Sequence, residues 1–291
     1  MKTKNYYGLM AMAIAMMTAG CTQEADEVMN QEQGEVVTTF AVGGDFELPA
    51  FKAMTRGELT ADGKAMTDLW VLDYKDGALV QQLHQTSDDE DFGSPTLALS
   101  LGQHHIYFVC SRGTTPTLST DAHNITWATT SDTFYKDYSA NVTSGSTANR
   151  SVTLDRVATK LGITIADAIP TGTAYVEITP ATWYYGLDYL TGEATAAQTA
   201  GTRTINIPES RIGKTGTNLN IFGLSGATEW TTDVTVTACD ADDNVLGSAV
   251  ISDAPFVANR ATSYSGNLFS GGGDFSLTMD DTWGTEHTAT W

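Results

Sequence analysis

The chain contains three groups of polar residues whose types could bind a metal ion. The segment Asp240–Asn244 (DADDN) offers the oxygen ligands with which a calcium loop begins. Ile251 occupies the position that needs a bidentate glutamate, so a hairpin turn is favoured. Asp88–Asp91 is a carboxylate run typical of a solvated loop, with a weak divalent-ion site as the alternative. His104 and His105 begin a predicted strand and point to opposite faces, so they cannot jointly bind one metal ion without another element.

Motifs of the common catalytic classes are absent from the sequence. It has no G-x-S-x-G nucleophile elbow, no H-E-x-x-H zinc motif, no P-loop and no glycine-rich dinucleotide fingerprint. Scattered Ser, His and Asp residues occur in any chain of this length. We therefore expect a protein that is not an enzyme and that uses neither a cofactor nor a metal ion.

An aromatic run offers the best candidate for ligand contact. Aromatic faces stack on sugar rings, so Trp183, Tyr184 and Tyr185, with Tyr189 close behind, are candidate glycan contacts of a surface glycan-binding protein or tip adhesin. The alternative, which is favoured, is a loop folded over one end of a β-sandwich by its own aromatic rings. Buried rings would indicate packing, and exposed, co-planar rings would indicate glycan binding.

The charge excludes two classes of partner. The 291 residues include 15 Lys and Arg against 35 Asp and Glu, a net charge of -20. A surface this negative repels phosphate backbones and anionic headgroups, so neither nucleic-acid binding nor electrostatic membrane docking is expected. Hydrophobic residues make up 41% of the chain, enough to fill a core in each of two domains of ordinary size.

The N-terminus has the pattern of an export signal. Lys2 and Lys4 precede an apolar run, GLMAMAIAMM, that is too short to span a bilayer. Thr18-Ala19-Gly20-Cys21 resembles a bacterial lipobox, in which the cysteine is acylated and becomes the mature N-terminus. This predicts a signal peptide over 1–20 and a lipid on Cys21; an ordinary signal peptide with an incidental cysteine is the alternative.

An acidic, flexible tether is expected over 21–34. Its QEADE run resembles the signal that sends Bacteroidota lipoproteins to the outer face of the outer membrane. The predicted location is therefore the cell outer membrane, as a surface-exposed lipoprotein or part of a fimbrium. The other two cysteines, Cys110 and Cys239, lie in strand-like runs of different halves, which favours two buried thiols over a disulfide.

The rest of the chain has the period-2 alternation of β-strands. Hairpin turns are expected at Lys75-Asp76-Gly77 and at Asp240–Asn244, and short helical turns at Thr60–Met66 and Thr133–Tyr138. The expected strands are Val36–Val42, Asp68–Tyr74, Ala78–His84, Thr96–Leu101, His105–Ser111, Ile125–Thr129, Ser151–Leu154, Thr159–Ile165, Ala174–Thr179, Arg203–Ile207, Leu219–Leu224, Asp233–Ala238, Val245–Ser252 and Phe275–Met279, with another possible at Thr285–Trp291.

About fourteen short strands in two groups of seven predict an all-β protein of two tandem β-sandwiches, over 35–150 and 151–291. The polar run Thr143–Arg150 marks the expected boundary. In Ser151–Asp167 the apolar side chains switch from even to odd positions, which indicates a bulge or a change of sheet. This segment is therefore expected to carry the chain from one sandwich to the other.

Four features, in this order, resemble the Bacteroidales fimbrillin superfamily of lipoprotein-derived pilus subunits and fimbrial anchors. The first is the lipobox. The others are Met54–Tyr74, with an arginine loop before a T-D-L-W-V-x-D-Y strand; Ser151–Ile165, with a V-x-L-x-R-x-x-x-K-L pattern; and Phe256–Phe269, with an asparagine-arginine turn. The resemblance covers nearly the whole mature chain and is closest to the anchor and minor-subunit branch.

The resemblance implies two transthyretin-like Greek-key β-sandwiches that assemble with other fimbrial subunits by strand exchange. In the family an Arg-specific protease removes the first strand of polymerising subunits, whereas anchors keep it. Here that strand is Val36–Val42, and the candidate cleavage position is Arg56, the only arginine between Cys21 and Arg112. An ordinary loop arginine in an uncleaved anchor is the alternative. The implied function is a structural fimbrial subunit or anchor that supports adhesion, with host or bacterial surface ligands as possible further partners.

Overall fold

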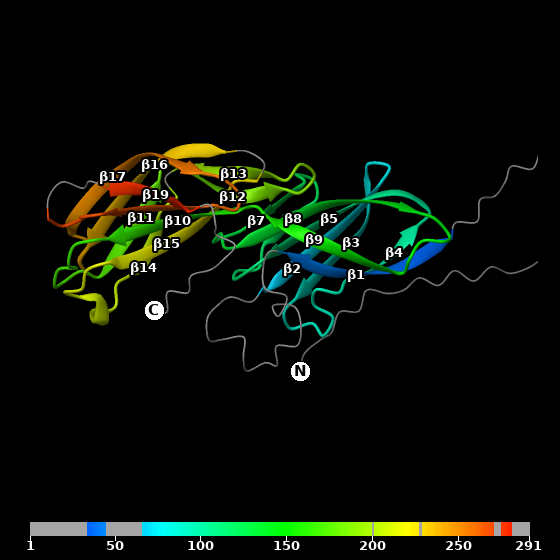
Figure 1. Ribbon diagram of the computed structural model, residues 1–291, viewed down its shortest axis with the longest axis horizontal. Helices are drawn as coiled ribbons and strands as arrows, with labels where there is room; N and C mark the ends of the chain where they lie inside the picture. Colours follow the sequence, from blue (N-terminus) through cyan, green and yellow to red (C-terminus); the bar gives the residue numbers. More distant parts are fainter. Residues whose placement is uncertain (1–33, 45–65, 200, 227–228, 271–274, 281–291) are drawn as a thin grey trace, which may run out of the picture. The chain divides into compact units, whose positions relative to one another are not determined.

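The computed structural model describes residues 34–44, 66–199, 201–226, 229–270 and 275–280 (Figure 1). The predicted signal peptide, Cys21, most of the tether, Arg56, the helical turn expected at Thr60–Met66 (except Met66) and the possible strand at Thr285–Trp291 lie outside these residues. Within them the fold is all-β, as expected, and its one short helix is a 3-10 turn, η2 (Glu209–Arg211). No helix in the described part of the chain is long and apolar enough to cross a membrane.

The first half of the chain forms a seven-stranded sheet in the order β3-β2-β5-β8-β9-β1-β4. Its strands bury one face in a common cluster that includes Phe40, Leu69, Phe108 and Leu154. Buried and exposed residues alternate along strands such as β9, as the sequence predicts, because successive side chains of a strand point to opposite faces. The strands are β1 (Glu35–Gly44), β2 (Asp68–Lys75), β3 (Ala78–Thr86), β4 (Thr96–Ser100), β5 (Gly102–Ser111), β8 (Thr133–Val142) and β9 (Asn149–Arg156).

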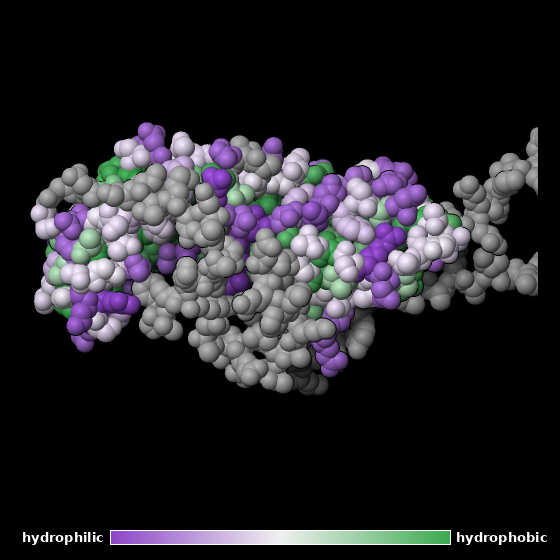
Figure 2. Space-filling model, in the orientation of Figure 1, coloured by the Kyte–Doolittle hydropathy of each residue, from purple (hydrophilic) through white to green (hydrophobic). Residues whose placement is uncertain are grey.

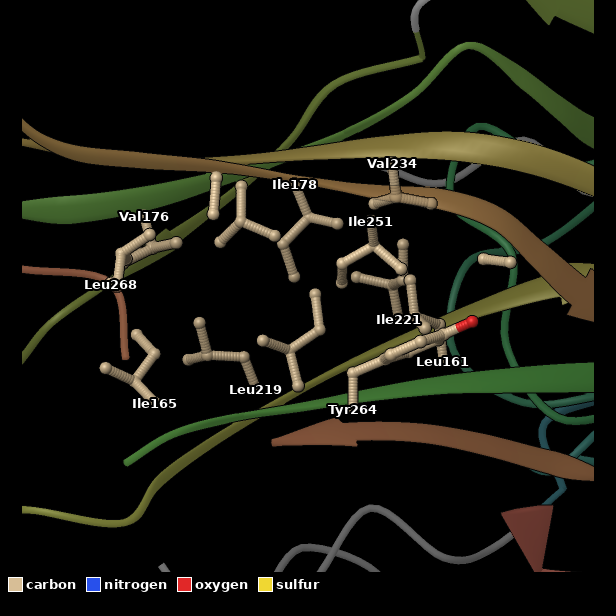
Figure 3. Close-up of a cluster of buried hydrophobic side chains, with 14 of the residues drawn as sticks. Leu161, Ile165, Val176, Ile178, Leu219, Ile221, Val234, Ile251, Tyr264 and Leu268 are labelled. Atoms are coloured by element: carbon tan, nitrogen blue, oxygen red, sulfur yellow. The ribbon is translucent and has the colours of Figure 1, made fainter. Parts of the chain in front are cut away.

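The second half contains two four-stranded sheets, β15-β10-β18-β19 and β14-β11-β16-β17. Their apolar side chains point toward one another and form one cluster, in which Ile165 and Leu219 of the first sheet face Val176 and Ile178 of the second (Figure 3). The strands are β10 (Ala158–Ile165), β11 (Tyr175–Pro180), β14 (Arg203–Asn206), β15 (Thr217–Leu224), β16 (Trp230–Cys239), β17 (Val245–Phe256), β18 (Ala261–Gly266) and β19 (Phe275–Asp280).

A further four-stranded sheet, β13-β12-β7-β6, takes strands from both halves. It is made of β6 (Thr117–Ser119), β7 (Asn124–Thr126), β12 (Thr182–Asp188) and β13 (Glu193–Thr199). Only Ala181 separates β11 from β12, yet the two strands pair with different neighbours: β11 with β14 and β16, and β12 with β7 and β13. A third buried cluster lies here, with Tyr74 and Trp127 from the first half and Leu187 and Tyr189 from the second.

The switch of apolar parity in residues 151–167 does mark a change of sheet. β9 belongs to the seven-stranded sheet and β10 to the β15-β10-β18-β19 sheet, and the single residue Val157 connects them. Val152 and Leu154 point into the first cluster, whereas Leu161 and Ile163 point into the second. The shift of one residue turns the side chains toward the other core.

Local turn chemistry follows the sequence, but one local prediction is wrong. Asp76 and Gly77 both have positive φ, 53° and 77°, as the two-residue β2–β3 hairpin requires. The segment 133–138 is not a helical turn; it is the first part of β8, which pairs with β5 over ten positions. Those ladder hydrogen bonds come from residues about 30 positions away, a contribution that local propensity does not contain.

Candidate functional site: the β1 slot

β1 is an interior strand of the seven-stranded sheet, between β9 and the end strand β4 (Figure 1). It pairs antiparallel with β4 from Glu35↔Ser100 to Thr39↔Thr96, and parallel with β9 from Thr39↔Asn149 to Gly44↔Leu154. Its first half therefore pairs with β4, and its second half pairs with β9. We call the space that β1 fills between β4 and β9 the β1 slot.

One face of β1 is buried in the core of the first sheet. Thr38, Phe40 and Val42 alternate inward, and Phe40 is completely buried. The Phe40 ring lies edge-on to Phe108 and Tyr138, with centroids 5.4 and 5.7 Å away. The floor of the slot is apolar, so an empty slot would expose this surface to water. The other floor residues in the cluster include Leu97, Leu99, Ala140, Val142, Val152 and Leu154.

Backbone hydrogen bonds beyond the strand ladders also hold β1. The N–H groups of Phe40 and Val42 donate to the carbonyls of Pro95 (2.9 Å) and Gly93 (3.0 Å), and Thr39 N–H donates to Ala148 (2.7 Å). At the other end, Leu101 N–H donates to the carbonyl of Gly34 (3.2 Å). Removing β1 would leave a row of such groups without partners, and each one that stays buried costs about 1–3 kcal/mol.

A cleft of about 340 Å³ opens beside the first residues of β1. It is lined by Glu35, Asp73, Val80, Gln81, Ala98, Ser100 and His104, which come from β1, β2, β3, β4 and β5. β3 and β4 are the two end strands of the seven-stranded sheet, so the cleft lies between its two edges. It therefore gives solvent access to the start of β1.

The proposed glycan residues are not displayed as a platform. They lie on the strand β12, not in a loop, and Trp183 and Tyr185 are buried at 0% and 4% exposure. Trp183 Nε1 donates to the Phe222 carbonyl (3.1 Å), and its ring packs edge-on against Trp230 and Phe256. Tyr184 is half-buried. This burial favours packing, the alternative to glycan contact.

His104 and His105 lie on opposite faces of β5, and Asp240–Asn244 forms a hairpin turn, as the sequence predicts. His104 points inward and is buried, whereas His105 points outward and is exposed. The Asp240 carboxylate accepts hydrogen bonds from the backbone N–H groups of Asp242 and Asn244, both at 2.9 Å, and so closes the β16–β17 hairpin. Asp88 lies in an exposed turn.

The two described cysteines, Cys110 and Cys239, are free and buried, as expected. Burial raises the pKa of the Cys110 thiol well above its usual range. A thiol with a raised pKa holds little thiolate, so Cys110 is expected to be unreactive in the folded protein.

Two of the segments that carried the family resemblance meet around Arg156. Arg156 donates from Nε and Nη2 to the two carboxylate oxygens of Asp132 (2.7 and 3.2 Å) and from Nη1 to Asn259 Oδ1 (3.1 Å). Its guanidinium also lies 4.7 Å from the centre of the Phe134 ring. Sequence reasoning missed this contact; the arginine of V-x-L-x-R and the asparagine before Arg260 were its only signals.

Comparison with known proteins gives a match in structure alone. No protein-family model and no curated protein sequence matches the chain. Two solved structures of candidate adhesins from Bacteroides ovatus are similar. One has a TM-score of 0.51 at 11% identity, over 90% of this chain and 96% of that one. The other has a TM-score of 0.50 at 8% identity, over 81% and 87%.

The C-terminally truncated tip fimbrial protein Mfa3 from Porphyromonas gingivalis also aligns, with a TM-score of 0.45 at 13% identity over 84% of this chain and 98% of that one. At these identities, the two adhesin alignments show a shared fold and not a shared function. The chain has the all-β fold of the two Bacteroides ovatus proteins.

Proposed function

We propose that this protein is a structural subunit or outer-membrane anchor of a fimbrium, and that it assembles with other subunits by exchange of the strand in the β1 slot. The observation that carries the proposal is the position of β1: it is the first described strand, yet it lies between β4 and β9 with a buried apolar face. No described strand precedes β1, so β1 can leave this slot without unthreading the described part of the fold. An extended segment of a partner can then take its place, a form of β-augmentation.

The two similar proteins of known structure are described as candidate adhesins, which supports a role at the cell surface.

The proposal includes removal of residues 1–20, a lipid on Cys21 and a surface-exposed location. It also includes two tandem transthyretin-like Greek-key sandwiches, with the boundary expected near Arg150 moved to Val157, between β9 and β10. Mass spectrometry of the native protein tests the lipid: residues 1–20 should be absent and Cys21 should carry an added lipid mass. Cys21→Ser should release the protein from the membrane.

The test of strand exchange uses the full chain cut with an Arg-specific protease, with Arg56→Ala as the matched control. After cleavage at Arg56, β1 is held without a covalent connection to β2, and a fluorescent peptide of residues 34–44 should replace it. The same peptide carrying Phe40→Asp should not, because the slot buries this ring completely. Light scattering follows assembly of the cleaved protein.

Uptake of the native peptide, or polymers of the cleaved protein, would support a polymerising subunit. Resistance at Arg56, together with a location at the base of a fimbrium, would support the anchor. A cleaved protein that stays monomeric and binds neither peptide after residues 21–56 have been washed away would rule out exchange through this slot.

A further inference from the structure

The end of β4 is held by two side chains that reach it from β2 and β5. Lys75 Nζ donates to Ser100 Oγ (2.9 Å) and to the Leu101 carbonyl (2.8 Å). His104 Nε2 lies 2.8 Å from the Ser100 carbonyl. Three polar atoms of two consecutive residues are therefore bound by one ammonium group and one imidazole.

The imidazole is itself held in place. His104 Nδ1 lies 2.7 Å from Asp73 Oδ1, and both side chains are 1% exposed. A carbonyl can only accept a hydrogen bond, so Nε2 must carry a proton and donate it to Ser100. Burial raises the pKa of the Asp73 carboxyl, although the hydrogen bond from His104 lowers it in part.

Glycine at position 102 makes room for the lysine. Gly102 has φ +128°, which L side chains rarely adopt, and a Cβ atom there would lie 3.2 Å from Lys75 Cε. The turn between β4 and β5 thus leaves a path for the lysine stem to reach Ser100 and Leu101.

The residues held in this way are the ones that support the start of β1. Ser100 pairs with Glu35, and Leu101 N–H donates to the Gly34 carbonyl. In the described part of the chain, positions 35–38 have a strand partner in β4 only, because pairing with β9 begins at Thr39. This end of β1 is therefore held by β4 alone, and the cleft beside Glu35 and Ser100 exposes it to solvent.

We propose that Lys75 and His104 form a clamp that fixes the Ser100–Leu101 end of β4 and thereby controls how easily β1 opens from its Gly34 end. Lys75 and His104 are positioning residues that act on β1 through β4. The importance of the clamp for assembly rests on the proposed strand exchange, but the clamp itself is a property of the folded chain. Loss of either side chain leaves acceptors at the end of β4 without donors, so the free energy of local opening falls.

Hydrogen–deuterium exchange of the full chain, read by mass spectrometry, measures this opening directly. Lys75→Met keeps the length of the stem and removes the ammonium, and His104→Gln keeps an amide donor but loses the link to Asp73. The matched controls are Lys136→Met, which removes an exposed lysine paired with Asp155, and His105→Gln, which changes the exposed neighbour. Peptides over 34–40 and 96–101 report on the clamp, and peptides over 217–224 report on the remote β15.

In Lys75→Met, exchange over 34–38 should become at least about tenfold faster, with β15 unchanged. The two controls should match the wild type. Unchanged exchange over 34–38 in folded Lys75→Met, or equal acceleration at β15, would overturn the clamp. If His104→Gln does not fold, Lys75→Met decides alone. Faster exchange over 34–38 in Lys75→Met, together with a cleaved protein that takes up no peptide, would support the clamp and reject strand exchange.

Discussion

Arg156 is a cation that is almost entirely removed from water, at 5% exposure, and its partners explain why it is tolerated there. Asp132 supplies both carboxylate oxygens, and Asn259 supplies a third acceptor. Arg112 approaches the same carboxylate at 3.3 Å. A planar guanidinium suits this fork of acceptors, whereas the single ammonium of a lysine does not.

Replacing Arg156 with Met should lower the free energy of unfolding by about 3–5 kcal/mol, because Asp132 would lose its bidentate partner inside the protein. Lys136→Met is the control, since Lys136 and Asp155 form an exposed pair at 39% and 71% exposure and should contribute at most about 1 kcal/mol. Urea unfolding followed by fluorescence measures both. Equal losses in the two variants would contradict a specific role for Arg156.

Asp167 holds the end of the segment that follows β18. Its carboxylate accepts hydrogen bonds from the backbone N–H groups of Leu268, Phe269 and Ser270 at 2.8–3.0 Å. Burial raises the pKa of Asp167, but these hydrogen bonds lower it more, so the pKa lies below its usual value. A depressed folded-state pKa stabilises the fold above the unfolded pKa of 3.8, and this contribution is lost as the pH falls through the folded pKa.

Asp167→Ala should therefore cost about 1–3 kcal/mol at neutral pH, because three donors lose their acceptor. The difference from the wild type should stay constant down to about pH 5 and shrink below about pH 4. Unfolding midpoints measured over this range test both the size and the sign. Asp242→Ala, at an exposed turn, should change stability by less than about 0.5 kcal/mol. A difference that grows as the pH falls would contradict the assignment.

At the scale of elements, β1 shows how the two faces of one strand differ. Phe40→Ala removes a fully buried ring from the slot and should destabilise the protein by about 3–5 kcal/mol. Val37→Ala changes the outer face, where the side chain is 61% exposed, and should cost less than about 0.5 kcal/mol. Thermal unfolding compares the two variants. A large loss in Val37→Ala would mean that the outer face of β1 is covered in solution.

The contact between β12 and β15 depends on a glycine. Trp183 lies against the backbone of Gly223, and a Cβ atom added there would approach Cζ2 of the Trp183 ring to 2.8 Å. Gly223→Ala should displace the buried ring and cost about 1–3 kcal/mol. Gly145→Ala is the control, because a Cβ there meets nothing within 4 Å. Near-ultraviolet circular dichroism reports on the Trp183 packing; an unchanged spectrum and stability in Gly223→Ala would contradict this arrangement.

At the scale of the molecule, the two halves share buried surface. The Tyr74 and Tyr189 hydroxyls are 2.9 Å apart, and Tyr135 donates to the Tyr189 carbonyl at 3.0 Å. β7 from the first half pairs with β12 from the second. Figure 2 shows polar and apolar residues interspersed over the described part of one face of the molecule. The large apolar groups at the centre of the shared cluster are inside, with Leu72, Leu187 and Tyr189 completely buried.

Neither half should therefore fold fully when expressed alone. Fragments 34–156 and 157–291 would each expose part of the shared cluster, including Leu72 and Tyr107 or Leu187 and Leu224. We expect each fragment to bind a hydrophobic dye and to unfold at a lower temperature than the whole chain, and mixing the two should restore stability. Calorimetry checks this. Two fragments that each unfold cooperatively at the temperature of the whole chain would contradict it.

The sequence by itself determined the class of fold, the inward face of many strands and the position of the main hairpins. These features are local: alternation along β1 and β3 follows from the pleat of a single strand, and Asp76-Gly77 can be read from the φ values that its turn needs. The change of sheet at Val157 could also be predicted, because a shift of the apolar side chains from even to odd positions turns them toward another core.

Only the tertiary structure decided which strands that are distant in the sequence pair with one another. The parallel pairing of β1 with β9 joins residues about 110 positions apart, and the strand over 133–138 exists because β5 supplies its hydrogen bonds. The burial of Trp183 and the contact of Arg156 with Asn259 depend in the same way on distant partners. A residue's own type specifies what it can bond to, whereas the packing of remote segments specifies what is within reach, so the β1 slot and its clamp could be found only in the folded chain.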